Sequence, residues 1–199
     1  MAAKIVYSVL AGILISASNS NAQDIRFGFL GGIDITYSTW RHYPNEQVAE
    51  AFDYDPMVSF NINGHISYKT AGALGFSLEP GFMQKGGKGL ENNQLNQRVT
   101  INYLQMPILI DFYILDRLFV SVGPEIAYLA EKNYANPSFE LSGLVGVNYN
   151  IIKHIDLGLR YNHGLTYFTS FDLIDDYGNL TGTAKEYNQY LQFIIRFKF

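Results

Sequence analysis

Most of this sequence alternates between apolar and polar residues with a period of two. The alternation covers eight segments: 25–37, 58–69, 73–85, 98–112, 119–129, 139–150, 155–167 and 187–199. A period of two predicts β-strands with one apolar and one polar face. In the fourth segment the apolar positions change phase after Tyr103, and a β-bulge near Tyr103 and Leu104 is expected to restore the register. The chain is therefore predicted to be all-β.

The connections between these segments differ in length in a regular way. The odd-numbered connections are long (38–57, 86–97, 130–138 and 168–186), and the even-numbered ones are short (70–72, 113–118 and 151–154). Outer-membrane barrels combine short periplasmic turns with longer outer loops. Beyond residue 22, no run approaches the roughly 18 apolar residues of a spanning helix. The pattern predicts an eight-stranded antiparallel transmembrane β-barrel of up-and-down topology, with both termini in the periplasm.

The two faces of the predicted strands differ in side-chain size. One face carries large apolar residues, whereas the other is polar and rich in glycine. Small residues suit the interior of a narrow barrel, so we expect the apolar face to meet lipid. The lumen is predicted to hold a charge network of Arg26, Asp34, Glu79, Lys85, Glu125, Glu140, Asp156, Arg160 and Arg196, with Lys198 as a further cation. Because buried charges need partners, this balance favours a plugged barrel.

The first 22 residues have the features of a secretory signal peptide. Lys4 supplies a positive charge, residues 5–15 are apolar, and Ser20 and Ala22 place small residues before the predicted cleavage site. We expect residues 1–22 to be removed, leaving an exported outer-membrane domain over residues 23–199. The alternative is a buried N-terminal helix.

The chain ends on an alternating strand without a polar tail. A terminal aromatic residue after alternating apolar residues resembles the signal that the barrel-assembly machinery recognises. The predicted assembly signal consists of Phe193, Ile195, Phe197 and Phe199. The alternative is a plain last strand that closes on the first strand, so that no strand edge remains in lipid.

The sequence offers little for catalysis or metal binding. Cysteine is absent and the net charge is -4, which argues against thiol chemistry and nucleic-acid binding. His163, Ser170 and Asp172 form the one grouping near the outer rim that a hydrolase could use, and a histidine beside a solvated loop is the simpler interpretation. The acidic residues at 172, 175 and 176 are interpreted as solvated rather than as calcium ligands. We predict no enzyme, no cofactor and no metal.

Four short motifs resemble one known family. They are FSLEPGFMQKG (76–86), YLQMPI (103–108), VGPEIAYL (122–129) and GLRYNHGL (158–165). In this order they resemble the PorT-like outer-membrane β-barrel family of Bacteroidetes. The resemblance implies an integral outer-membrane barrel, and a member of that family is associated with protein secretion and gliding.

These observations predict a non-enzymatic outer-membrane barrel with a structural, secretion-associated or surface-interaction role. Its expected partners are outer-membrane lipid, the barrel-assembly machinery and a secretion or surface protein, with no nucleic acid. Three alternatives stay open: a small pore, an outer-membrane hydrolase, and a soluble lipocalin-like barrel with its apolar face turned inward.

Overall fold

The computed structural model describes residues 24–41, 56–91, 94–130, 138–175 and 177–199. The described residues form ten antiparallel strands: β1 (Asp24–Arg41), β2 (Met57–Lys69), β3 (Leu74–Leu78), β4 (Gly81–Glu91), β5 (Gln94–Tyr113), β6 (Leu118–Leu129), β7 (Phe139–Ile152), β8 (Ile155–Gly164), β9 (Thr169–Ile174) and β10 (Leu180–Lys198). The predicted signal peptide lies outside these residues. Among the residues described, no helix combines the length and apolar character needed to cross a membrane.

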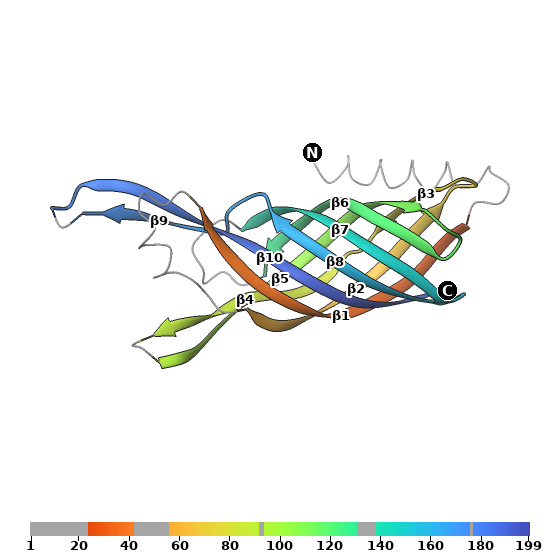
Figure 1. Ribbon diagram of the computed structural model, residues 1–199, viewed down its shortest axis with the longest axis horizontal. Helices are drawn as coiled ribbons and strands as arrows, with labels where there is room; N and C mark the ends of the chain where they lie inside the picture. Colours follow the sequence, from red (N-terminus) through yellow and green to blue (C-terminus); the bar gives the residue numbers. More distant parts are fainter. Residues whose placement is uncertain (1–23, 42–55, 92–93, 131–137, 176) are drawn as a thin grey trace.

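The strands close into a ring with eight strand positions (Figure 1). β1 pairs with β2 on one side and with β10 on the other, which joins the two ends of the chain. β3 and β4 share one position, because both lie between β2 and β5. The structure confirms the predicted all-β fold and the eight-stranded antiparallel barrel. Its short turns and its C-terminus lie at one end, which the general asymmetry of such barrels assigns to the periplasm.

The apolar face of the strands points outward. Residues on this face remain substantially exposed in the isolated chain, as shown by Phe27, Phe29, Ile33, Phe60, Ile62, Phe76, Ile110, Val122, Val147, Leu159, Phe193 and Ile195. The opposite face is buried and contains most of the charged and amide side chains of the strands. This arrangement is that of a membrane barrel, and it contradicts the lipocalin-like alternative, whose apolar face would point inward.

The predicted third strand is interrupted at Glu79 and Pro80. Proline has no backbone N–H, so it interrupts a ladder in which every strand has two neighbours. The interruption is still bonded on both sides: Gly64 N donates to Pro80 O (2.8 Å), and Glu79 N donates to Pro107 O (3.0 Å). The ring therefore stays closed across the gap between β3 and β4.

The predicted bulge near Tyr103 and Leu104 is wrong. Burial alternates without interruption from residue 100 to residue 112 of β5, and both Ile101 and Tyr103 lie inside, in phase with Gln105 and Leu109. The apparent phase change arises because the lumen accepts apolar side chains at its outer end. Pro107 also faces inward, without any bulge.

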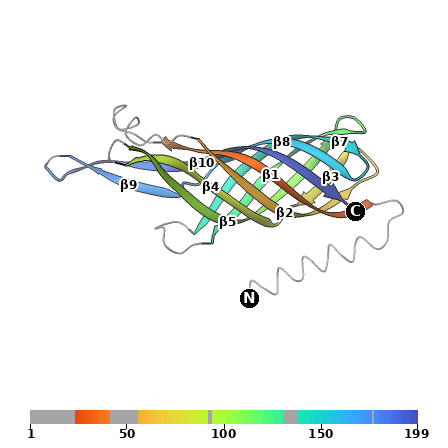
Figure 2. The same ribbon diagram turned by 90° about the horizontal axis from the view of Figure 1, so that it is seen from below.

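Two of the connections expected to be loops form β-hairpins, and residues 38–41 of a third continue β1. β4 and β5 remain paired from Gly81↔Gln105 to Glu91↔Gln94, and β9 pairs with the first part of β10 from Glu186↔Thr169 to Leu180↔Ile174. Both pairs project beyond the outer end of the ring as long hairpins (Figure 1 and Figure 2). The run of glycines from Gly86 to Gly89, predicted to be a flexible loop, belongs to the first of these hairpins.

Candidate functional site

The middle of the lumen is built around the carboxylate of Glu79, in the gap between β3 and β4. Arg160 of β8 donates two hydrogen bonds to it, from Nη1 to Oε2 (2.6 Å) and from Nη2 to Oε1 (2.9 Å). Arg196 of β10 donates a third from Nη2 (2.9 Å), and His65 Nδ1 of β2 lies 3.1 Å from Oε1. Glu79, Arg160 and Arg196 are almost fully buried. A bidentate arginine–carboxylate pair is a strong, geometrically specific contact, so these strands are tied together across the lumen.

A second acidic residue extends this group toward the periplasmic end. Asp156 of β8 accepts from Arg196 Nη1 (3.1 Å) and from Asn150 Nδ2 (2.7 Å), and Lys198 Nζ lies 2.8 Å from its Oδ1. We call Glu79, Asp156, Arg160, Arg196, Lys198 and His65 the Glu79 cluster. It brings three cations together with two carboxylates, so one positive charge is left in excess within the cluster.

The outer half of the lumen contains a separate Lys85 cluster. Lys85 Nζ of β4 donates to Glu140 Oε1 of β7 (2.9 Å) and to Glu125 Oε1 of β6 (3.2 Å). Two residues of β10 complete it: Asn188 Nδ2 donates to Glu140 Oε2 (2.7 Å), and the Tyr190 hydroxyl donates to Glu125. One lysine thus serves two carboxylates whose other oxygens are held by neutral donors.

The remaining predicted lumen residues lie apart from both clusters. Asp34 of β1 is buried and accepts from the side-chain amide of Asn61 at 3.0 Å on each oxygen. Arg26 lies at the periplasmic mouth among the residues that line a small pocket. The structure therefore places seven of the nine predicted charged residues in the two clusters. Of the other two, Asp34 accepts hydrogen bonds from the amide of Asn61, and Arg26 lies at the periplasmic end of the barrel.

An apolar layer lies inside the ring beside the Lys85 cluster. Ile101, Tyr103 and Ala127 are buried inside the ring, and Leu129 and Phe168 pack against them. Apolar side chains inside a barrel exclude water from that layer. The sequence alternation concealed this layer, because Ile101 and Tyr103 occupy positions that elsewhere in the lumen are polar.

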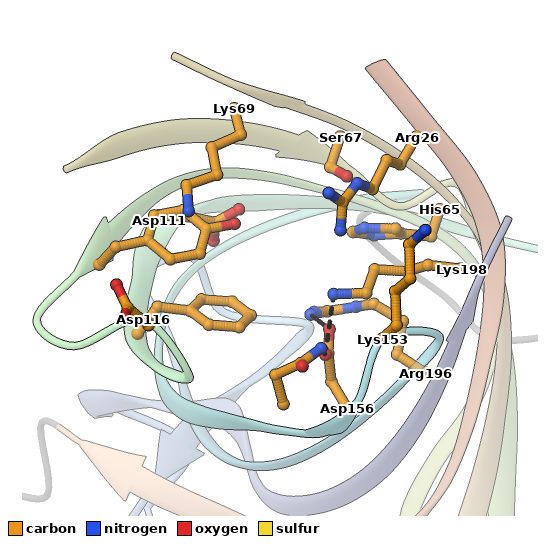
Figure 3. A pocket seen from close by; sticks show the side chains of 13 residues that line it. Arg26, His65, Ser67, Lys69, Asp111, Asp116, Lys153, Asp156, Arg196 and Lys198 are labelled. Atoms are coloured by element: carbon orange, nitrogen blue, oxygen red, sulfur yellow. Dashed lines mark hydrogen bonds and ion pairs between the residues drawn. The ribbon is translucent and has the colours of Figure 1, made fainter. Parts of the chain in front are cut away.

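A blind pocket of about 170 Å³ opens at the periplasmic mouth (Figure 3). Arg196, His65 and Asp156 of the Glu79 cluster line it, together with residues of the strand ends and turns. Its five cations are Arg26, Lys69, Lys153, Arg196 and Lys198, and its three acids are Asp111, Asp116 and Asp156. Lys69 Nζ lies 4.0 Å from the centre of the Tyr113 ring. The excess of cations would suit a small anion, and the Glu79 cluster separates the pocket from the rest of the lumen.

The outer rim does not form the hydrolase grouping considered above. His163 Nε2 lies 2.5 Å from Arg41 Nη2, and its Nδ1 lies 3.1 Å from the Tyr161 hydroxyl. Both ring nitrogens are therefore engaged by groups other than Ser170 and Asp172. Asp172 accepts from the Thr183 hydroxyl (3.2 Å). Across the described part of the chain, no three His, Asp or Glu side chains are arranged to hold a metal ion.

Several lumen residues were not among the predicted site residues. His65, Asn188 and Tyr190 are buried partners of the charged groups, and Asn61 holds Asp34. A signal was present, since each has the inward parity of its strand. Their partners could not be assigned from parity, because partners across a lumen depend on strand tilt and stagger.

The last strand lies where its alternation predicted. Phe193, Ile195 and Phe197 face outward, and Phe197 stacks on Phe29 of β1 with ring centres 5.0 Å apart. Phe199 N donates to Phe27 O (2.8 Å), so the final residue is part of the β1–β10 seam. The role of these four residues as an assembly signal stays a prediction.

A closed antiparallel ring with an apolar outer face and a polar interior defines the class of membrane-spanning β-barrels. The family model described as "Outer membrane protein beta-barrel domain" matches residues 17–170. The chain belongs to this family of outer-membrane barrels.

Solved structures of outer-membrane proteins resemble this chain in fold. OprG from Pseudomonas aeruginosa is 15% identical, with 89% of this chain and 95% of OprG covered and a TM-score of 0.41. Ail from Yersinia pestis is 10% identical (88% and 99% covered, TM-score 0.46). Neisserial surface protein A is 16% identical (90% and 100% covered, TM-score 0.45). Among curated protein sequences, none matches this chain.

Proposed function

We propose that this protein is a closed, non-conducting and non-enzymatic outer-membrane barrel that displays two long hairpins at the cell surface as an interaction platform. The main observation that supports this proposal is the filled lumen. From the periplasmic end outward, the Glu79 cluster and then the Lys85 cluster occupy the lumen, and the apolar layer of Ile101, Tyr103 and Ala127 adjoins the Lys85 cluster. A path for ions would have to break buried ion pairs at two levels.

The β9–β10 hairpin supports a role in recognition. Three large side chains near its tip project into solvent, with exposed fractions of 64% for Ile174, 91% for Tyr177 and 66% for Leu180. Exposed apolar and aromatic side chains gathered on one structural element are typical of protein-interaction sites. The tip lies beyond the ring, at the end opposite the periplasmic turns (Figure 1).

The tip is held in one conformation by Asp175. Its Oδ1 accepts from the backbone N–H of Tyr177 (2.9 Å) and of Asn179 (2.7 Å), and its Oδ2 accepts from the Asn179 side chain (3.0 Å). Gly178 has a φ of 84°, in the left-handed region that glycine adopts without strain. A rigid tip loses little conformational entropy when a partner binds.

The resemblance to PorT-like proteins supports a finer version of this proposal. In this version, the partner of the hairpins is a component of a secretion system. Export by cleavage after Ala22, and assembly through the terminal residues Phe193, Ile195, Phe197 and Phe199, belong to the same proposal. The outer-membrane family and the position of Phe199 in the closing seam support it.

Electrical recording from planar lipid bilayers tests the closed lumen. The folded barrel, verified by its heat-dependent shift on a gel, is expected to show only background leak, because both ion-pair clusters and the apolar layer would have to open together. A known porin inserted under the same conditions is the positive control. Discrete conductance steps from the purified barrel would support the pore alternative instead.

Replacing Asp175 with alanine is expected to loosen the tip without affecting the barrel. Hydrogen bonds from the Asn179 side chain and the N–H of Asn179 hold the pKa of Asp175 below its ordinary value. The ionised carboxylate of Asp175 therefore stabilises the turn at neutral pH. This stabilisation is lost as the pH falls through the lowered pKa and the carboxylate is protonated. We expect less protection of the Tyr177 and Asn179 amides in D175A, and in the wild type under strong acid, where protection is the exchange rate of the free amide at the same pH divided by the observed rate. Asp172→Ala is the matched control, and equal exchange in the two variants would contradict the turn's dependence on Asp175.

A further inference from the structure

The outward surface of the β1–β10 seam changes from apolar to cationic within a few residues. The paired outward positions along the seam run from Phe29↔Phe197 through Ile35↔Leu191 to Tyr37↔Gln189, and end at Arg41↔Lys185. Phe29 and Ile35 belong to the exposed apolar band that faces lipid. Arg41 and Lys185 therefore lie just beyond the outer edge of this band, at the level of lipid headgroups.

Arg41 and Lys185 are placed directly opposite each other on neighbouring strands. Side chains at opposite positions of an antiparallel pair are close, and like charges there repel. Within the described part of the chain, no carboxylate lies within ion-pairing distance of either cation. On the same face of the ladder the nearest acid is Asp172, which lies opposite Thr183 and accepts from its hydroxyl. Glu186, next to Lys185 in the chain, has the opposite parity and is buried. The pair thus lacks a described counter-charge and would be stabilised by an anion between the two side chains.

A chain of hydrogen bonds fixes the guanidinium of Arg41. Arginine has no acceptor, so Arg41 Nη2 donates to His163 Nε2. The Nδ1 proton of His163 is then directed to the Tyr161 hydroxyl, which donates to Gln189 Oε1 (2.9 Å). Gln189 Nε2 donates to Thr39 Oγ1 (2.5 Å). These residues belong to β1, β8 and β10, so the three strands around the seam determine the position of one charge.

Aromatic rings flank both cations. The Arg41 guanidinium carbon lies 4.6 Å from the centre of the Tyr187 ring, and Lys185 Nζ lies 5.0 Å from the centre of the Tyr167 ring. The hydrogen bond to His163 uses one of the five N–H donors of Arg41. Arginine binds phosphate oxygens in a bidentate manner, and lysine adds a point charge.

We propose that Arg41 and Lys185 form a binding site for the phosphate group of an anionic lipid of the outer leaflet, with the acyl chains on the apolar band below. The position of the site favours a lipid, rather than a soluble anion, as its ligand. Its cations face outward at the edge of the band, where a headgroup arrives together with its own chains. Each basic residue near a membrane surface contributes roughly 1 kcal/mol toward anionic lipid, or about fivefold in affinity.

Lipid retention by the purified full-length barrel tests this proposal. The protein is refolded in uncharged detergent containing phosphatidylglycerol or phosphatidylcholine with identical chains, and retained lipid is counted by native mass spectrometry. We expect preferential retention of phosphatidylglycerol, a roughly 25-fold loss of affinity for it in R41Q/K185Q, and a roughly fivefold loss in K185Q. Lys185 takes no part in the hydrogen-bond chain, so K185Q is expected to fold. The loss of affinity for phosphatidylglycerol can therefore still be measured in K185Q if the double variant does not fold.

The control removes the same charge at the other end of the barrel. Arg117 is exposed on a periplasmic turn and does not line the periplasmic pocket, so R117Q is the control for K185Q and is expected to retain phosphatidylglycerol as the wild type does. An equal loss in K185Q and R117Q would show that the effect depends only on net charge and would overturn the proposal, as would equal retention of the two lipids by the wild type. Inorganic phosphate in excess is expected to leave the lipid bound. Displacement by phosphate would indicate a site for a free anion and overturn the lipid assignment.

Discussion

Replacing Glu79 with glutamine is expected to destabilise the barrel by about 3–5 kcal/mol, which is the usual cost of leaving buried charges without their partner. The substitution keeps the shape of the side chain but removes the carboxylate that Arg160 and Arg196 share. Arg196 would retain Asp156, whereas Arg160 would keep no carboxylate among its described ion-pair partners. Urea unfolding of the barrel in lipid vesicles measures the free energy of unfolding.

Two further variants identify the cause of that loss. Asp116 is an exposed acid on a periplasmic turn, so D116N removes the same charge and is expected to change the free energy of unfolding by no more than about 0.5 kcal/mol. The double variant E79Q/R160Q removes the orphaned cation together with its acid and is expected to recover part of the stability. A loss in E79Q no larger than that in D116N would show that the cluster does not hold the barrel together.

Replacing Gly123 with alanine is expected to reduce strongly the yield of folded barrel. A Cβ atom at this position would lie 2.0 Å from the carbonyl oxygen of Ile108 and 3.0 Å from its carbonyl carbon. Both are backbone atoms of the neighbouring strand, so β5 or β6 would have to move, at a cost of at least the roughly 1–3 kcal/mol of an overpacked core. The fraction of heat-shifted protein after refolding, and its urea midpoint, measure the effect.

Gly143 provides the matched control on the next strand. A Cβ atom there would have no neighbour within 4 Å, so G143A is expected to fold as the wild type does. If both variants fold equally well, the close approach of β5 and β6 at Gly123 is not required for the fold.

The sequence predicted the arrangement of the barrel better than its details, for physical reasons. Alternation and the parity of loop lengths are local properties of the sequence. They were therefore sufficient to predict the ring, its outward apolar face and the inward position of residues such as Glu79 and Arg160. The break at Pro80 was not predicted, because Glu79 and Pro80 preserve the alternation even though proline removes a ladder hydrogen bond. The inward position of Tyr103 was missed, because an apolar layer inside the lumen looks like a shift of register when only parity is available.

Pairing within the lumen was the least predictable part. The charge list identified acids and bases that face inward, but it did not show that Lys85 would serve both Glu125 and Glu140, or that Asp34 would bind an amide rather than a cation. Such pairs depend on the stagger of strands that are distant in sequence. The outer hairpins were also missed as β-structure, since β9 contains only six residues and its pairing with β10 lies beyond the ring.

The distribution of the Glu79 cluster along the chain has a consequence for biogenesis. Arg196 is 117 positions away from Glu79 and lies on the last strand, which also supplies Lys198 as a partner of Asp156. A chain whose last strand has not yet inserted leaves Asp156 without either cation and Glu79 with one arginine instead of two, beside His65. Charge compensation in the lumen is therefore completed in the same step that seals the seam, so an unfinished barrel is distinguished from a finished one by its internal electrostatics as well as by its open edge.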